Sequence, residues 1–298
     1  MRVFVTGATG FIGLTVTKEL IAAGHQVSGL ARSPEKAKAL AAAGAEVVMG
    51  SIQDLDGVKR AAARADGVIH LAFNHDFSKF VENCEDDRRV IAALGSVLEG
   101  SGRPLIVTSG TLIANSAPGR LASEEDEAIN SEAHPRAASE EAARAAAAKG
   151  VNVSVVRLPQ VHDRARQGLV TFAIGIALEK GVCPYVGDGQ NRWPSAHILD
   201  TARLYRLALE KAEPGATCHA VAEEGVSFRD IAEVLGRQLK LPVRSISPDE
   251  AKDHFGWLAV FAGFDAPASS ALTRQRLQWQ PKERGLLADL AELEYAGW

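Results

Sequence analysis

The chain has 298 residues, 46% of them hydrophobic and 23% charged, which is typical of a globular protein with a large buried core. Its formal net charge is −4 and both signs are mixed along the sequence, so we expect no nucleic-acid partner and no membrane-surface partner. No run of 18 apolar residues exists, so no helix is expected to span a bilayer.

Strand-length apolar runs alternate with helical patterns over the first half of the chain. We predict strands at 3–6, 26–30, 46–49, 68–72, 105–108 and 153–157, and helices at 11–23 and 35–43. Nearly continuous apolar strands separated by helices indicate a parallel sheet that is covered on both faces. The expected fold class is therefore α/β, a Rossmann-type doubly wound parallel sheet.

After about residue 160 the connections lengthen, and glycine, proline and tryptophan enter the loops, as at 187–194. Residues 217–221 are candidates for an edge strand of the sheet, and Ser227 is expected to cap a helix that begins at Phe228. We therefore expect a cofactor-binding Rossmann domain at 1–165, to which part of 195–225 returns. Residues 166–298 are expected to form mainly a smaller, interleaved C-terminal lobe that binds substrate.

The first turn between strand and helix, at 6–13, reads TGATGFIG. Gly7 permits the tight turn, Gly10 lets the backbone approach a pyrophosphate, and Gly13 lets the helix pack closely on the strand. The start of the helix offers free N–H groups and a positive dipole end to that anion. The alternative is a glycine-rich turn without a ligand. The favoured interpretation is a dinucleotide site whose contacts come from Gly7, Thr9, Gly10, Phe11, Ile12 and Gly13.

The second predicted strand ends in GLARS, at 29–33. An acidic residue at this point would accept hydrogen bonds from an adenosine ribose and favour NAD(H). Arg32 with Ser33 instead suits a ribose 2′-phosphate, so we expect NADP(H) as the cofactor and NAD(H) as the weaker candidate. A solvated arginine at a strand end is the alternative interpretation.

With these motifs, the chain resembles the extended branch of the short-chain dehydrogenase/reductase superfamily. The likeness continues in GSIQD (50–54), VIHLAF (68–73), VVRLPQV (155–161), WPSAHILDTARLYRLALE (193–210) and SSALTRQRLQWQP (269–281). The resemblance implies further cofactor contacts after the later strands, at Ser51, Ile52, Leu71, Ala72, Phe73, Ser109, Pro159 and Val161. Relatives commonly form homodimers through helices that correspond to regions near 85–99 and 137–149, so a homodimer is also expected.

The catalytic set of that family does not carry over. Its members use Ser or Thr after the fifth strand and Tyr-x-x-x-Lys at the start of the next long helix, where the spacing puts both side chains on one face. No lysine follows at that spacing after any tyrosine of this chain: Tyr185, Tyr205 and Tyr295. By register, Arg136 and Glu140 fill the tyrosine and lysine positions, and Gly110 fills the serine position. In this respect the chain resembles atypical members of the superfamily.

Other side chains are candidates for the catalytic role. His75 follows the fourth strand and titrates near neutral pH, and we expect Asp76 to raise its pKa, although an ordinary loop histidine is the alternative. Ser109 and Thr111 either hydrogen-bond a substrate carbonyl or only satisfy the local backbone. Arg136 cannot readily give up a proton, but it can stabilise an oxyanion or grip a carboxylate or phosphate. A surface arginine is the alternative for that position.

Two neighbours of Arg136 have simpler expected roles. Glu140 is expected to pair with an arginine one turn away, Arg136 or Arg144, rather than to act as a base. His134 precedes a proline and is expected to shape the entry to the helix.

Three residues of the second half complete the candidates. Arg192 lies in a glycine-rich loop, where it either reaches a phosphate or is solvated. His197 and Asp200 are expected to tie the C-terminal lobe to the sheet. No metal site is predicted, because the histidines and acids near the fourth strand lack a suitable third ligand.

Three functions remain open at this stage. The favoured one is an NADP(H)-dependent oxidoreductase that reduces a carbonyl or an activated double bond of a small organic substrate, because hydride chemistry belongs to the cofactor. The second is a sensor or regulator that binds NADP(H) without turnover. The third is a sugar-nucleotide epimerase or dehydratase, which Arg192 favours and the missing tyrosine disfavours.

The cysteines bear on location. The three cysteines are isolated and follow no CxxC spacing, so we interpret them as thiols in a reducing compartment: Cys84, Cys183 and Cys218. The first residues, MRVFVTG, run straight into a predicted strand without an export signal. A cytoplasmic protein is therefore expected.

Overall fold

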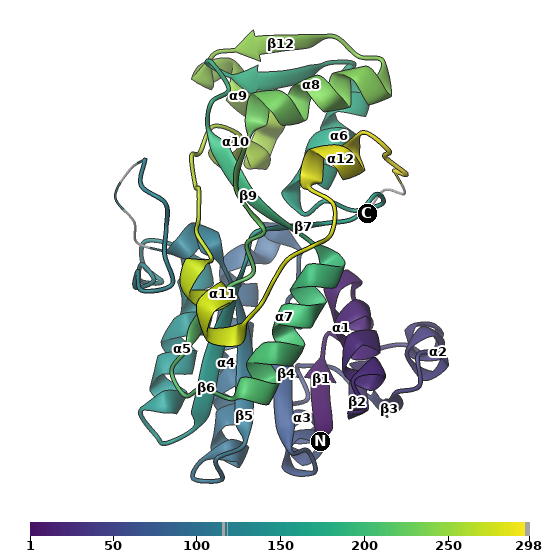
Figure 1. Cartoon of the computed structure of the whole chain (residues 1–298), viewed down its shortest axis with the longest axis vertical. Helices are drawn as coiled ribbons and strands as arrows, with labels where there is room; N and C mark the ends of the chain where they lie inside the picture. Colours follow the sequence, from purple (N-terminus) through teal and green to yellow (C-terminus); the bar gives the residue numbers. More distant parts are fainter. Residues whose placement is uncertain (115–116, 118, 296–298) are drawn as a thin grey trace.

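A seven-stranded parallel sheet is the main feature of the computed structural model, which describes residues 1–114, 117 and 119–295. The strand order is β10-β6-β5-β4-β1-β2-β3 (Figure 1). The strands are β1 (Arg2–Thr6), β2 (Gln26–Ala31), β3 (Glu46–Met49), β4 (Gly67–His70), β5 (Pro104–Gly110), β6 (Asn152–Leu158) and β10 (Thr217–His219). The predicted doubly wound α/β class is confirmed, and so is the edge strand predicted near 217.

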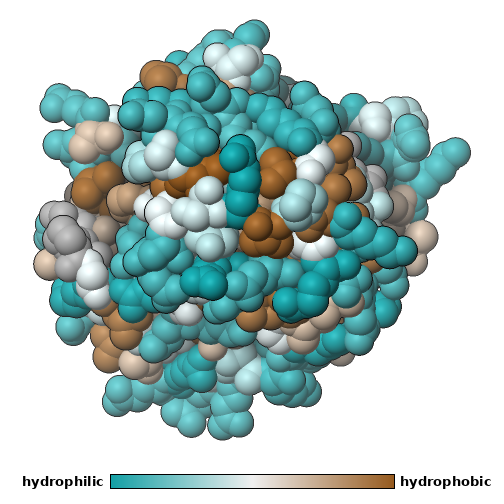
Figure 2. Space-filling view, turned by 90° about the horizontal axis from the view of Figure 1, so that it is seen from above, coloured by the Kyte–Doolittle hydropathy of each residue, from teal (hydrophilic) through white to brown (hydrophobic). Residues whose placement is uncertain are grey.

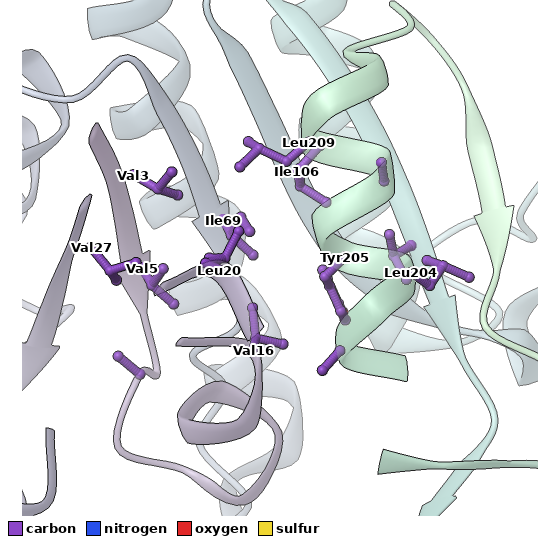
Figure 3. Packing of buried hydrophobic residues seen from close by; sticks show 14 of the residues in the cluster. Val3, Val5, Val16, Leu20, Val27, Ile69, Ile106, Leu204, Tyr205 and Leu209 are labelled. Carbon is purple, nitrogen blue, oxygen red and sulfur yellow. The ribbon is translucent and has the colours of Figure 1, made fainter. Parts of the chain in front are cut away.

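Helices cover both faces of this sheet because successive side chains of each strand point to opposite faces. Val5 points toward a core built with Val16 and Leu20 of one helix and Tyr205 of another (Figure 3). Phe4, its neighbour, points into the core on the other face. The first face is covered by α1 (Phe11–Ala22), α2 (Pro34–Ala42) and α7 (Ile198–Lys211), and the second by α3 (Leu55–Ala63), α4 (Phe80–Leu98) and α5 (Ala138–Ala147).

Two strand ends differ from the prediction. The strand predicted at 68–72 ends at His70, and residues 71–76 continue as irregular chain beyond the carboxyl edge of the sheet. The strand predicted at 105–108 extends to Gly110, so Ser109 lies within β5 rather than after it. Pairing with β6 as far as Gly110 and Leu158 explains the longer strand.

A second lobe lies above the carboxyl edge of the parallel sheet (Figure 1). It has its own hydrophobic core and consists of α6 (Leu169–Lys180), β8 (Cys183–Val186), α8 (Phe228–Leu239), β12 (Val243–Ile246), α9 (Pro248–Phe255), the 3-10 turn η4 (Gly256–Leu258), α10 (Ala259–Ala262) and α12 (Leu286–Leu290). Ser227 caps α8 as predicted, since its hydroxyl accepts from the Asp230 N–H at 3.1 Å.

A three-stranded sheet connects the second lobe to the parallel sheet. Its strands are β7 (Gln160–His162), β9 (Arg192–His197) and β11 (Glu223–Ser227). The remaining helix, α11 (Ala271–Leu277), packs back against α7 and β10. The chain therefore crosses between the lobes several times.

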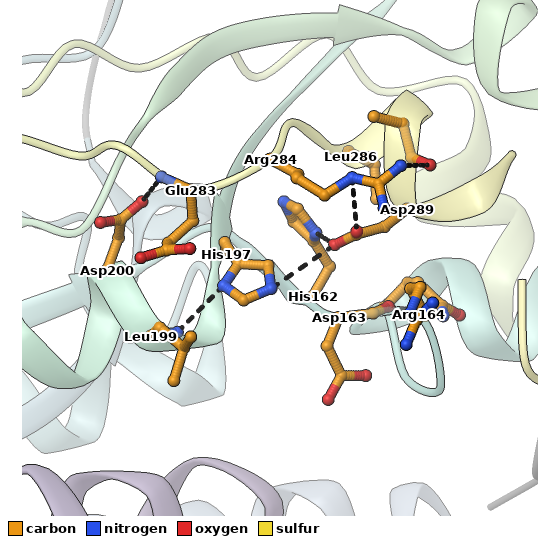
Figure 4. Close-up of polar contacts among 12 residues, drawn as sticks. His162, Asp163, Arg164, His197, Leu199, Asp200, Glu283, Arg284, Leu286 and Asp289 are labelled. Carbon is orange, nitrogen blue, oxygen red and sulfur yellow. Dashed lines mark hydrogen bonds and ion pairs between the residues drawn. The ribbon is translucent and has the colours of Figure 1, made fainter. Parts of the chain in front are cut away.

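Polar contacts fix the junction between α7 and the second lobe (Figure 4). His197 caps α7, and its Nε2 lies 3.8 Å from a carboxylate oxygen of Asp289 on α12. Asp200 accepts from the backbone N–H groups of Lys282 at 3.1 Å and Glu283 at 2.9 Å. These contacts give His197 and Asp200 the structural role that was predicted for them.

The surface of the second lobe is mainly hydrophilic when seen from above, with hydrophobic side chains gathered in a band across the middle (Figure 2). Its exposed large apolar side chains include Leu178, Trp257, Val260 and Phe264. In the described ranges of the chain, no helix is both long and apolar enough to cross a membrane.

Candidate functional site

A cavity of about 550 Å³ lies between the carboxyl edge of the parallel sheet and the second lobe. Its walls come from the loop after β1, the ends of β2 and β5, the chain after β4, and parts of α6, β9 and α10. Ligands of doubly wound sheets bind at this edge, because the loops that follow the strands meet there. The cavity is therefore the candidate site.

The glycine loop forms one end of the cavity. Gly7 has φ +67°, and a Cβ on it would lie 2.7 Å from the backbone nitrogen of Ala72. A Cβ on Gly13 would lie 2.0 Å from the Gly7 carbonyl oxygen, so neither position has room for a side chain. The loop therefore packs tightly on itself and presents the N-terminus of α1 to the cavity. This geometry fits the diphosphate of a dinucleotide.

Two cations line the same end of the cavity. They are Arg32, after β2, and Lys36, in the first turn of α2. Ser33 has a different role from the one expected, since its hydroxyl caps α2 by accepting from the Lys36 N–H at 3.4 Å. Lys36 was missed by the sequence interpretation, although it lies in the first turn of the helix that follows Arg32 and Ser33.

Most of the residues predicted to bind the cofactor line this cavity: Gly7, Thr9, Gly10, Phe11, Ile12, Gly13, Arg32, Ile52, Leu71, Ala72, Phe73, Pro159 and Val161. Three of the predicted residues are outside its lining: Ser33, Ser51 and Ser109. The Ser51 hydroxyl instead bonds the side chain of Gln53, which does line the cavity.

His75 lines the cavity, but its environment differs from the one expected. Desolvation and the positive charge of Arg136 lower the pKa of His75. The predicted rise from Asp76 is wrong, because the Asp76 carboxylate turns back and accepts from the Ser78 N–H at 3.1 Å and from the Ser78 hydroxyl. His75 is therefore mainly uncharged at neutral pH.

Ser109 and Thr111 are placed differently with respect to the cavity. The Ser109 hydroxyl is buried and makes no hydrogen bond within the described part of the chain. Thr111 begins the 3-10 turn η2 (Thr111–Ile113) and lines the cavity, and its hydroxyl lies 3.4 Å from the Leu158 carbonyl oxygen. Of the two residues, Thr111 is the one that lines the cavity.

Arg136 lines the cavity and is held from several sides. It lies in the 3-10 turn η3 (Pro135–Ala137), just before α5. Its Nη2 donates to the Thr108 carbonyl at 2.9 Å, and its Nη1 pairs with Asp87 at 3.0 Å. The guanidinium carbon lies 4.4 Å from the ring centre of Phe73. Arg136 is therefore an oriented cation at the cavity wall rather than a surface arginine.

A buried carboxylate, Asp87 of α4, anchors this arginine. His70 Nε2 lies 2.8 Å from Asp87 Oδ1, and His70 Nδ1 lies 2.6 Å from the Thr6 hydroxyl. Burial alone would raise the pKa of Asp87, but the charge of Arg136 and the contact with His70 outweigh it and lower that pKa. The sequence interpretation missed Asp87, although an acid on the apolar stripe of a helix was an available signal.

Glu140 is part of a buried ion pair on the other side of α5. Arg157 of β6 donates to it from Nε at 2.8 Å and from Nη2 at 2.9 Å. An arginine partner was predicted, but the expected partners Arg136 and Arg144 are wrong, because Glu140 points toward the sheet and not along the helix. The residue that the sequence interpretation placed at the family's lysine position is therefore a carboxylate in a buried ion pair.

His134 and Arg192 have contrasting positions. His134 lines the cavity, and its Nδ1 accepts from the Arg136 backbone N–H at 3.3 Å, so it also shapes the helix entry as predicted. Arg192 is outside the lining and pairs with Asp265 at 2.8 Å. The phosphate-binding interpretation of Arg192 therefore has no geometric support.

The other end of the cavity is mainly aromatic, which the sequence interpretation did not foresee. The lining there includes Phe77, Phe80, Phe172, Trp193 and Phe261. The described residues that line the cavity include no tyrosine, aspartate or glutamate. Closely spaced phenylalanines at 73–80 were the available signal in the sequence.

Comparison with known proteins agrees with this geometry. A model of the NAD dependent epimerase/dehydratase family matches residues 3–221. An uncharacterised protein of Schizosaccharomyces pombe is 47% identical over 296 residues, which cover 99% of this chain and 100% of that protein. The 2-alkyl-3-oxoalkanoate reductase of Stenotrophomonas maltophilia is 30% identical over 245 residues, with 73% of this chain and 68% of that protein covered.

A solved structure with a similar fold is DesIV, a dTDP-glucose 4,6-dehydratase of Streptomyces venezuelae, which has NAD bound. The two chains match with a TM-score of 0.77 and 20% identity, over 98% of this chain and 95% of that one. At this level of identity the likeness concerns the fold.

Proposed function

Since the chain belongs to the NAD dependent epimerase/dehydratase family, we propose that it is an oxidoreductase that uses NADP(H) to reduce a carbonyl or an activated double bond of a small organic substrate. The observation that carries the proposal is the cavity that extends from the glycine loop to the aromatic side chains of the second lobe. One end suits a dinucleotide and the other end suits an apolar substrate.

The preference for NADP(H) over NAD(H) is supported by the charges at the glycine-loop end. Arg32 and Lys36 both line it, and a 2′-phosphate on the adenosine ribose would interact favourably with two cations. The described residues of the lining include no aspartate or glutamate, so no carboxylate there can accept hydrogen bonds from an unmodified ribose.

The cofactor, when bound, supplies the hydride, and the chain supplies orientation and charge. Thr111 offers a hydroxyl in the cavity wall that can hydrogen-bond a substrate oxygen. Arg136 offers a fixed positive charge for the negative charge that develops on that oxygen. His75 is mainly uncharged at neutral pH because its pKa is lowered, so it contributes hydrogen bonding rather than the proton of a charged ring. Ser109 has no direct role in this proposal.

The other interpretations are less well supported. A sugar-nucleotide epimerase or dehydratase agrees with the fold of DesIV, but the described lining offers no tyrosine and Arg192 is engaged by Asp265. A sensor that binds NADP(H) without turnover would have the same cofactor site. A measurement of NADPH oxidation distinguishes it from an enzyme. The homodimer through α4 and α5 and the cytoplasmic location stay predictions.

Calorimetric titration with NADPH and NADH tests the cofactor part of this proposal. We expect Arg32→Ala and Lys36→Ala each to weaken NADPH binding about 10-fold and to leave NADH binding nearly unchanged, as expected for one lost charge-assisted hydrogen bond. Lys38→Ala is the matched control, because Lys38 is an exposed lysine of the same helix outside the cavity lining.

Single-turnover oxidation of NADPH across a panel of carbonyl compounds tests the reaction. Turnover of any member supports an oxidoreductase over a sensor. Tight NADPH binding with no oxidation by any compound would contradict the proposed reaction. A rise in melting temperature with UDP-glucose but not with the carbonyl compounds would favour the epimerase or dehydratase interpretation.

A further inference from the structure

Aromatic side chains are concentrated at this one site. Of the ten phenylalanines in the sequence, six line the cavity: Phe11, Phe73, Phe77, Phe80, Phe172 and Phe261. Aromatic residues make up only 6% of the chain, so this enrichment is a specific property of the site. Ring faces and edges hold flat, conjugated ligands better than they hold puckered or hydroxyl-rich ones.

Seven of the rings form what we call the aromatic network: Phe73, His75, Phe77, Phe80, His134, Phe172 and Trp257. Phe77 is at its centre, with ring centres 5.9 Å from both Phe80 and Phe172. Phe77 also stacks on Trp257, at 4.5 Å and an interplanar angle of 17°. Every member except Trp257 lines the cavity.

The aromatic network joins the two lobes. Phe77 belongs to the 3-10 turn η1 (Phe77–Lys79), just after the irregular chain that follows β4, whereas Phe172 is on α6 and Trp257 is in η4 of the second lobe. Phe172 and Trp257 meet edge to face at 5.0 Å. The substrate end of the cavity is therefore bounded by a packed cluster of rings from both lobes.

The charge at this end is positive and fixed. Arg136 lies over Phe73, and its counter-ion Asp87 is buried behind it, outside the lining. The two cavity histidines are mainly uncharged at neutral pH, because desolvation and the charge of Arg136 lower the pKa values of His75 and His134. The site is better equipped to stabilise a negative charge than to donate a proton.

We propose that the substrate is a planar, conjugated ring carbonyl compound, a quinone or a cyclic enone, held against the rings of the aromatic network that line the cavity, with its oxygen toward Arg136. This inference rests on the proposed oxidoreductase function and names its substrate class. Saturated ketones lack both the flat ring and the ability to delocalise the charge, so they fit the site poorly.

The reaction balances without a protein acid. A C–H bond forms between the β carbon of the substrate and the hydride of the nicotinamide, whose own C–H bond breaks as NADPH is oxidised to NADP⁺. The electron pair of the substrate C=C bond moves into the bond between the α carbon and the carbonyl carbon, the π pair of the C=O bond moves onto the oxygen, and the resulting enolate oxygen lies near Arg136. Water then supplies the proton that completes the reduced product.

A binding experiment tests the substrate class separately from turnover. Calorimetry on protein saturated with NADP⁺ compares 2-naphthol with decahydro-2-naphthol, which has the same carbon skeleton but puckered rings. We expect 2-naphthol to bind at least about 5-fold more tightly than decahydro-2-naphthol, because its flat rings make one or two additional contacts with aromatic side chains. Equal affinities would overturn the proposal, whatever the enzyme turns over.

A kinetic experiment compares 2-cyclohexenone and 1,4-naphthoquinone with cyclohexanone, after subtraction of the rate without protein. We expect kcat/KM with NADPH to be at least about 10-fold higher for the conjugated compounds. Equal or faster reduction of cyclohexanone would refute the substrate class while supporting the proposed oxidoreductase. No NADPH oxidation by any compound would contradict both.

Variants connect the preference to the aromatic network. Phe77→Leu and Phe172→Leu keep apolar volume but remove a ring, and each is expected to reduce the affinity for 2-naphthol about 3- to 10-fold. Phe264→Leu is the control, because Phe264 is exposed and outside the lining. The proposal fails if Phe77→Leu and Phe172→Leu bind 2-naphthol as tightly as Phe264→Leu does, while all three variants still bind NADPH.

Discussion

The buried pair of Glu140 and Arg157 gives the sharpest test of how this site is built. Replacing Glu140 by glutamine removes the negative charge but keeps the size of the side chain. The Arg157 guanidinium then loses its charged partner and one of its two acceptor oxygens at position 140. Its other partners in the described part of the chain are the Asp126 carbonyl oxygen at 2.9 Å and a ring nitrogen of His219 at 3.3 Å. We expect this change to destabilise the fold and not to act through the chemistry of the cavity.

The magnitude follows from the geometry of the pair. Both side chains are almost fully buried, with 4% of the Glu140 side chain and 2% of the Arg157 side chain exposed, and two hydrogen bonds of 2.8 and 2.9 Å join them. Removing one partner of a buried ion pair lowers the free energy of unfolding by about 3–5 kcal/mol. At about 2–4 °C per kcal/mol, Glu140→Gln should lower the melting temperature by at least about 6 °C.

Thermal unfolding followed by circular dichroism at neutral pH measures this effect. Glu141→Gln is the matched control, since Glu141 is the next residue of α5 and pairs with the partly exposed Arg88. Loss of this ion pair should lower the free energy of unfolding by about 1 kcal/mol or less. The double variant Glu140→Gln/Arg157→Met should recover part of the loss, because no unpaired buried charge remains. A melting temperature for Glu140→Gln equal to that of the control would refute the reasoning.

Three further predictions follow from the same structure. Gly13→Ala puts a Cβ 2.0 Å from the Gly7 carbonyl oxygen, so calorimetry should detect no NADPH binding and the free energy of unfolding should fall by about 1–3 kcal/mol. Because the pKa of Asp87 is lower in the folded than in the unfolded protein, its ionised form stabilises the fold. This stabilisation is complete at pH values above the usual pKa of 3.8 and is lost as the pH falls through the lowered pKa of the folded protein. The difference in unfolding free energy between wild type and Asp87→Asn should therefore be constant near neutral pH and narrow below about pH 4, as urea titrations can measure. Burial raises the pKa of two thiols to about 11 and of the third to about 12, so iodoacetamide at pH 8 should label Cys84, Cys183 and Cys218 only after unfolding.

Local features of the sequence were sufficient for the parallel sheet and for the glycine loop at one end of the cavity. The strands alternate with helices at regular intervals, and burial of both sheet faces demands the continuous apolar runs that mark them. The glycine loop was equally readable, because Gly7 and Gly13 occupy positions where the backbone itself leaves no space for a side chain. Such constraints act over a few neighbouring residues, and a sequence displays them directly.

The side-chain partners were decided by the tertiary structure alone. Arg136 is held by Asp87, 49 residues away, and Glu140 by Arg157, 17 residues away. Phe77 meets Trp257 only because η1 and η4 face each other across the two lobes. A charged or aromatic side chain can reach any of several partners at similar cost, and the packing of helices and strands against one another determines which partner lies within 3 to 5 Å. No local pattern carries that information.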